Sequence, residues 1–106
     1  MADTREFFET YLPNKLTSNP ALASSVKASF QFVITDAGTW SLDLTTPPGT
    51  VTEGAIENPA CTITVSKADW ESILDNPGKA MQMFMMGKLK VGGQMALAMQ
   101  LQKILA

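Results

Sequence analysis

The chain of 106 residues contains no histidine and a single cysteine, Cys61. Without histidine it lacks the commonest catalytic base and the commonest metal ligand. One cysteine cannot form an internal disulfide, and a free cysteine is among the residue types most often found in protein cores. We therefore expect no catalytic activity, no cofactor and no metal site, and we expect Cys61 to be a small core residue.

Charge is also scarce, since charged residues make up 17% of the chain and the formal net charge is -2. Phosphate backbones are bound mainly through Lys and Arg, so we expect no nucleic-acid partner. Three lysines close together in the sequence, Lys79, Lys88 and Lys90, are the exception, and they leave a transient contact with anionic lipid headgroups open. No apolar stretch reaches the roughly 18 residues of a membrane span and the N-terminus lacks the pattern of a signal peptide, which predicts a cytoplasmic protein.

Acidic residues and glycines form no recognisable site. The carboxylates fall on predicted turns, outward strand positions and a helix surface, where solvation explains them better than acid–base chemistry does. Gly87 and Lys88 superficially resemble a phosphate loop, but Leu89 follows where Ser or Thr is needed. Turn chemistry is sufficient to explain these glycines.

Periodicity predicts one domain over residues 1–106. Alternation of period two predicts strands over 26–35, 40–45, 50–53, 61–66 and 88–91. Helical spacing predicts helices over 4–12, 67–75, 79–86 and 94–105, with Asp3 and Ser66 as N-caps, Pro13 ending the first helix, and a connector over 14–25 that holds a short helix at 21–25. These elements predict an α+β fold, in which helices cover a five-stranded antiparallel or mixed sheet.

Methionine is concentrated at the end of the chain, where six of the seven methionines fall between Met81 and Met99. Thioether side chains are flexible, so they are suited to lining a space whose contents vary in shape. They also fill gaps in ordinary buried cores. Periodicity alone favours the core interpretation over a ligand cavity.

Two segments resemble the sterol carrier protein 2 domain family. They are NPACTITVSKADW at residues 58–70 and MGKLKVGGQMALAMQLQKIL at residues 86–105, and the upstream GTWSLDL at 38–44 is similar to the family's second strand. The resemblance covers roughly residues 26–105. It implies helices on one face of a five-stranded sheet, an apolar tunnel between the two, and no catalysis.

The resemblance also implies the ligands and the wall of the tunnel. Ligands would be fatty acids, fatty acyl-CoA, phospholipids or sterol-like molecules, bound in the tunnel, with transfer within the cell as a further role. The wall carried over by position is Trp40, Leu42, Ile63, Phe84, Met85, Leu89, Val91, Met95, Met99 and Leu101. Strand alternation independently turns Trp40, Leu42 and Ile63 inward, whereas the helical positions fit an ordinary core equally well. Lys88 or Lys90 would meet a carboxylate or phosphate at the mouth.

A second hypothesis is a dry-core accessory domain. In that case the apolar C-terminal helix packs on a partner enzyme or on a second copy of the chain, driven by exposed apolar area. Under the lipid-binding hypothesis we expect a monomer or a weak homodimer.

Overall fold

The N-terminus forms one helical run in the computed structural model, which describes residues 3–45, 49–76, 78–98 and 100. The run consists of α1 (Thr4–Glu6), the π-helix η1 (Phe7–Tyr11) and α2 (Leu12–Ser18). Asp3 caps it as predicted, because its side chain accepts a hydrogen bond of 2.9 Å from the backbone N–H of Glu6. A short helix, α3 (Ala21–Val26), follows.

Pro13 does not end the first helix, so the prediction of a connector from residue 14 is wrong for residues 14–18. Proline lacks the N–H donor and its ring crowds the carbonyl four residues earlier. Here Pro13 lies in the first turn of α2, directly after the π-helical turn, where wider i→i+5 bonding changes the local spacing. The helical run therefore passes through the proline instead of stopping at it.

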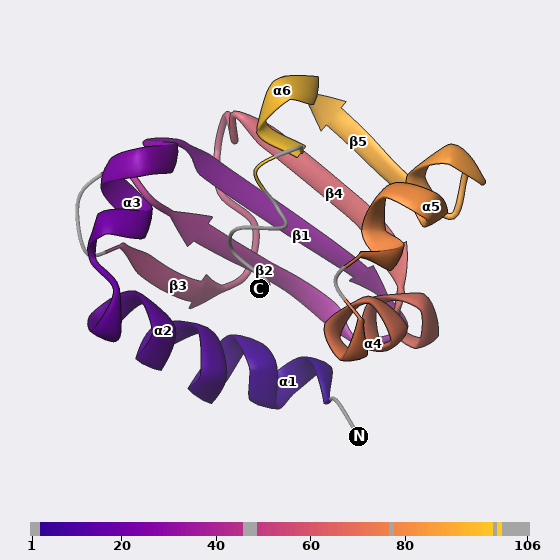
Figure 1. Cartoon of the computed structure of the whole chain (residues 1–106), viewed down its shortest axis with the longest axis horizontal. Coiled ribbons are helices and arrows are strands. Elements are labelled where there is room, and N and C mark those ends of the chain that lie inside the picture. The colour runs from indigo at the N-terminus through magenta and orange to yellow at the C-terminus, as the bar shows by residue number, and fades with distance from the viewer. Residues whose placement is uncertain (1–2, 46–48, 77, 99, 101–106) are drawn as a thin grey trace.

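Five strands form one mixed sheet in the order β3-β2-β1-β4-β5 (Figure 1). The strands are β1 (Ser29–Thr35), β2 (Gly38–Asp43), β3 (Thr50–Glu53), β4 (Cys61–Ser66) and β5 (Leu89–Gly93). The central pair, β1 and β4, is parallel, and the other three pairs are antiparallel. Strand β1 begins three residues later than predicted, because α3 extends through Val26.

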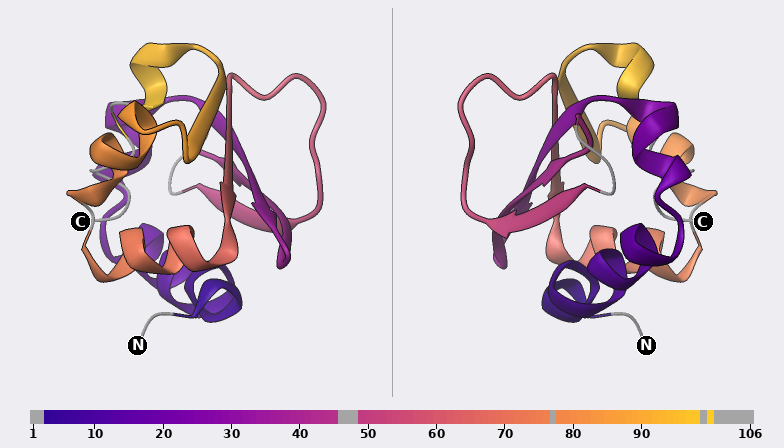
Figure 2. Two further views of the ribbon diagram at one scale, coloured as in Figure 1. Left: turned by 90° about the vertical axis from the view of Figure 1, so that its right-hand side faces the viewer. Right: turned by 90° about the vertical axis from the view of Figure 1, so that its left-hand side faces the viewer.

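The helices cover one face of this sheet, and the β3–β4 connection runs over the other (Figure 2). That connection is tied to outward polar side chains of β1: the N–H of Ile56 donates to Gln31 Oε1 at 3.1 Å, and the N–H of Ala60 donates to Ser29 Oγ at 3.2 Å. Strand side chains alternate between the two faces. The inward side chains of β1, Phe30, Phe32 and Ile34, are accordingly buried.

The second half of the chain supplies α4 (Lys67–Asp75), α5 (Lys79–Met85) and the short α6 (Met95–Ala98). Ser66 caps α4 as predicted, accepting a hydrogen bond from the N–H of Asp69 at 3.2 Å. Gly87 follows α5 with φ +77°, a conformation that glycine adopts without strain. Much of the predicted helix over 94–105 lies outside the described residues.

Aromatic rings fill the space between the N-terminal helices and the sheet. Phe8 stacks on Trp40 at 4.8 Å between ring centroids and on Trp70 at 5.7 Å, so one ring joins η1, β2 and α4. Thr4 links the N-terminal helical run to α4, because its N–H and hydroxyl both donate to Glu71 Oε2. This end of the molecule is therefore a packed core.

Candidate functional site

The inner face of the sheet presents a continuous apolar wall. Trp40 and Leu42 of β2, Ile63 of β4 and Leu89 of β5 are all buried on it, with 0–3% of each residue exposed. Val91 is half-buried and lies opposite Ile63 in the antiparallel β4–β5 register. Five of the ten residues predicted for a tunnel wall are thus brought to one sheet face.

The other five predicted wall residues fall in segments that the sequence predicts to be helical. Phe84 on α5 is half-buried and packs against the core. Met85 lies outside this wall, because its side chain is 80% exposed on the outer side of α5. Met99 and Leu101 lie outside the described residues, as does the side chain of Met95. Their part in a tunnel stays a prediction.

A hollow of about 390 Å³ lies along one face of the N-terminal helical run. Its lining residues recur at helical spacing on η1 and α2, with one from α1: Glu6, Thr10, Tyr11, Asn14, Lys15 and Ser18. Residues three and four apart share a helix face. The lining residues include one carboxylate, that of Glu6, and one cation.

That cation is the Lys15 amine. Less than 1 Å² of Nζ is exposed, and it makes no hydrogen bond within the described part of the chain. Its closest described interaction is with the Tyr11 ring, whose centroid lies 6.0 Å away, a distance at which a cation–π contact is weak. Burial lowers the pKa of the Lys15 amine, because desolvation disfavours the charged form.

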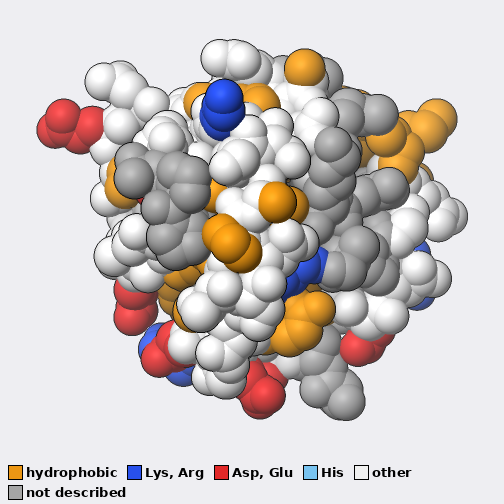
Figure 3. All heavy atoms as spheres, turned by 60° about the vertical axis from the view of Figure 1, so that its left-hand side comes forward, with side chains coloured by type: hydrophobic (Ala, Val, Ile, Leu, Met, Phe, Trp, Pro, Cys, Tyr) orange, Lys and Arg blue, Asp and Glu red, His pale blue; other side chains and the backbone are white. Residues whose placement is uncertain are grey.

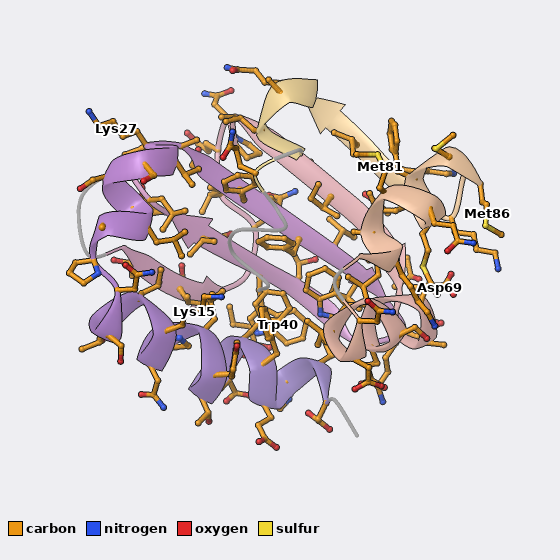
Figure 4. The ribbon with its side chains drawn as sticks, in the orientation of Figure 1. Lys15, Lys27, Trp40, Asp69, Met81 and Met86 are labelled. Carbon is orange, nitrogen blue, oxygen red and sulfur yellow. The ribbon has the colours of Figure 1, made fainter. Side chains whose placement is uncertain are left out.

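The position of Lys15 suits a ligand's polar end. Figure 4 places Lys15 on the side of α2 that faces the rest of the molecule. A buried ammonium without an acceptor is costly, and a carboxylate or phosphate would supply both an acceptor and the opposite charge. Sequence reasoning missed Lys15, since it lay in the segment taken for a connector.

The two lysines predicted to stand at a tunnel mouth lie on β5 and at the turn before it. Lys90 is exposed and is paired in register with Thr64. Directly opposite residues point to the same face of a sheet, and Thr64 alternates with the inward Ile63 and Val65, so Lys90 faces away from the inner wall. Lys88 is exposed just after α5.

A second hollow, of about 290 Å³, lies between η1, the start of α2 and strand β3, where it reaches Trp40 and Glu53. Arg5 stands at this edge, 3.6 Å from Glu53 Oε2 and 5.8 Å from the centroid of the Trp40 ring. The Arg5 guanidinium also donates a hydrogen bond of 3.0 Å to Glu9 Oε2, so it is paired with acidic side chains. This second hollow therefore presents no unpaired cation comparable to Lys15.

Cys61 is fully buried on β4, and burial raises the pKa of its thiol. A buried thiol with a raised pKa is a poor nucleophile. Within the described ranges, no three His, Cys, Asp or Glu side chains come together as a metal-binding group. Among the helices that the structure describes, none combines the length and apolarity that crossing a bilayer requires.

Comparison with known families gives one match over most of the chain. The model of the SCP-2 sterol transfer family matches residues 8–106. Hydroxysteroid dehydrogenase-like protein 2 of Xenopus laevis is 31% identical over 106 residues, which cover 97% of this chain and 25% of that protein. The chain spans about a quarter of the length of the curated relatives it matches.

Solved structures share the fold. Sterol carrier protein 2 from Yarrowia lipolytica in its apo form superposes with a TM-score of 0.72 at 25% identity, covering 95% of this chain and 82% of that one. Palmitated SCP2L2 from Aedes aegypti, solved in solution, has a TM-score of 0.58 at 24% identity, covering 89% of this chain and 90% of that one.

Proposed function

Since the chain belongs to the SCP-2 sterol transfer family, we propose that it is a non-catalytic domain that binds a lipid with a long apolar tail and an anionic head. The observation that supports the anionic head is the Lys15 amine, which is buried in its hollow and makes no hydrogen bond with the part of the chain that the structure describes. The tail lies along the inner face of the sheet. Transfer of such a lipid between membranes is the expected use.

The apolar wall supplies the driving force. Each methylene removed from water contributes about 0.8 kcal/mol, so a long acyl chain offsets the loss of freedom on binding. The proposed wall consists of Trp40, Leu42, Ile63, Phe84, Leu89 and Val91, with Met95, Met99 and Leu101 carried over from the family resemblance. Met85 is omitted because it is exposed.

Lys15 favours fatty acids and other anionic lipids over sterols. A carboxylate beside the amine would remove the cost of the unpaired cation, and a hydrogen bond between charged groups is roughly twice as strong as a neutral one. A sterol hydroxyl would provide only a neutral acceptor. The palmitated structure from Aedes aegypti, which shares the fold, supports a fatty acid as the ligand to test first.

The test is displacement of a fluorescent fatty acid by palmitate and by hexadecanol, after native mass spectrometry of the purified protein. We expect a copurified lipid, micromolar or tighter binding of palmitate, and about tenfold weaker palmitate binding by Lys15→Gln. Hexadecanol binding should not change. Lys27→Gln is the matched control, because Lys27 is an exposed lysine at the end of α3.

Two results would contradict the proposal. If no lipid copurified and no added lipid bound, the proposed function itself would be wrong. If Lys15→Gln weakened the binding of palmitate and of hexadecanol equally, the protein would still be a lipid-binding domain. Lys15 would then not be the residue that recognises the head.

The length of the relatives favours one second function, that of an accessory domain beside an enzyme. Matched relatives named hydroxysteroid dehydrogenase-like protein 2 are about four times as long as the matched region. In such a setting an exposed surface of this domain would pack on a partner. Sedimentation of the lipid-loaded and lipid-free protein separates the two functions, since only the accessory domain needs a partner or second copy to cover apolar surface.

A further inference from the structure

The outer half of α5 carries exposed methionine. Met81, Met85 and Met86 are 36%, 80% and 57% exposed, while the buried side of the helix is formed by Ala80 with the half-buried Met83 and Phe84. Helical spacing places Met81 and Met85 one turn apart on one face. Figure 4 shows Met81 and Met86 projecting from opposite ends of α5.

Lysines border these methionines. Lys79 begins α5, and Lys88 follows Met86 after the Gly87 turn; both are exposed. We call Met81, Met85, Met86, Lys79 and Lys88 the α5 surface. The exposed half of α5 contains no acidic residue, because its only other exposed member is Gln82.

The positive charge of this surface contrasts with the rest of the chain. Residues 1–75 hold all ten acidic residues and four of the eight basic ones, whereas residues 76–106 hold four lysines and no acid. In Figure 3, where the side of the molecule opposite α5 comes forward, acidic side chains stand along the left and lower margins. The lysines of the α5 surface therefore lie in a stretch of the sequence whose charged residues are all basic.

We propose that the α5 surface docks on the headgroup region of an anionic phospholipid bilayer. Flexible apolar side chains flanked by lysines are the pattern of interfacial contact: the apolar chains enter the boundary of the acyl region, and the lysines stay among the phosphates. Each lysine held near an anionic leaflet adds attraction. The α5 surface shares no residue with the Lys15 hollow, so an experiment can contradict membrane docking without contradicting lipid binding, and the reverse.

A second copy of the chain is a poorer occupant. A two-fold interface places the same patch on both sides, so Lys79 and Lys88 would meet their own copies, and like charges across an interface are repulsive. The surface also lacks exposed Trp, Tyr or Arg, the residues that anchor most protein interfaces. An anionic bilayer has neither drawback.

Asp69 lies on the first turn of α4, on the same side of the molecule as Met86 in the view of Figure 4. A carboxylate there would be repelled by an anionic leaflet. We therefore infer an orientation in which the outer side of α5 and the Gly87 turn face the membrane, and the first turn of α4 stays in water.

The test is vesicle flotation with phosphatidylcholine alone and with phosphatidylcholine containing about 30% phosphatidylserine, a composition with the surface potential of a strongly anionic leaflet. We expect binding only to the anionic vesicles, weakened by added salt. Lys79→Gln with Lys88→Gln should weaken binding about 25-fold, at about fivefold for each lysine. Met85→Gln with Met86→Gln should weaken it at least tenfold.

Lys27→Gln is the charge-matched control, since Figure 4 places Lys27 at the end of the molecule opposite Met86, and it should retain wild-type binding. All variants should displace fluorescent fatty acid in vesicle-free solution as the wild type does, which separates docking from the proposed lipid site. Equal binding to both vesicle types, no binding to either, or equal loss in Lys27→Gln would overturn the proposal. Loss of vesicle-free lipid binding in the methionine variant would overturn it too, since these residues would then serve the interior.

Discussion

At the scale of single residues, the Lys15 amine lowers the stability of the unliganded protein, because it is buried as a cation without an acceptor in the described structure. Leaving a buried donor unsatisfied costs about 1–3 kcal/mol. The cost is tolerated where a ligand relieves it, and strained or unpaired groups are commonly found at functional sites. The same residue therefore connects stability to ligand binding.

Lys15→Met should stabilise the free protein by about 1 kcal/mol at neutral pH. Because the pKa of Lys15 is lowered in the folded state, the unfolded chain holds this proton more firmly. The free energy of unfolding of the wild type should then rise as the pH climbs toward the usual lysine pKa, and the advantage of the variant should shrink. Urea denaturation at several pH values between about 7 and 10 measures both.

The difference between variant and wild type isolates Lys15, since the other lysines and Tyr11 titrate in both proteins. A difference that stays constant with pH would mean that the amine is not the source of the cost. A destabilised Lys15→Met would mean that Nζ has a stabilising partner.

Lys15 could have been found from the sequence only with the correct helix. Tyr11, Lys15 and Ser18 are four and three residues apart, so they share a face once the helix is extended past Pro13. The proline rule ended the helix six residues too early, and the residues of the hollow on α2 fell into a predicted connector. The missing information was the π-helical turn Phe7–Tyr11, which has no recognisable sequence signal.

At the scale of elements, the strands were predictable because burial on one sheet face imposes alternation. Trp40, Leu42 and Ile63 were placed inward by period two alone and are buried. Helix α4 was predictable for a similar reason, since Ser66 and Asp69 form a local capping pair. Features that depend on distant backbone, such as the approach of β5 to the β3–β4 connection, carry no local signal.

That approach gives a prediction at Gly93, at the end of β5. Its φ is +87°, and a Cβ there would lie 2.5 Å from the carbonyl oxygen of Ala60. The same oxygen accepts a hydrogen bond of 3.0 Å from the N–H of Gln94. Gly93→Ala should therefore destabilise the protein by about 2 kcal/mol or more, combining left-handed strain with displacement of Ala60.

Gly92→Ala is the matched control, because a Cβ at Gly92 meets only Thr62 Cβ at 3.8 Å and the backbone there needs no positive φ. It should change the free energy of unfolding by less than about 0.5 kcal/mol. Equal effects of the two substitutions in urea denaturation would show that the β5 end adjusts to a side chain without cost.

At the scale of the whole molecule, the sequence predicted five strands and helices on one face but left the sheet antiparallel or mixed. The choice depends on β1 and β4, which pair in parallel although two strands and a long connection separate them. Parallel neighbours need such a crossover. Here it is a loop over the outer face, held by Gln31 and Ser29, and it leaves the inner face to the helices (Figure 2).

A ligand held between the sheet and the helices should stabilise the whole domain, because it binds only the folded state. At a free concentration about 100 times its Kd, the gain is about 2.7 kcal/mol, which for a domain of this size raises Tm by about 10 °C. Dodecanoate, kept below its critical micelle concentration, is a suitable probe for differential scanning calorimetry. Lys15→Gln should show a smaller rise with dodecanoate and the wild-type rise with dodecanol. A rise in Tm that does not grow with ligand concentration, or the same rise in both proteins with both ligands, would contradict a site that pairs the apolar wall with Lys15.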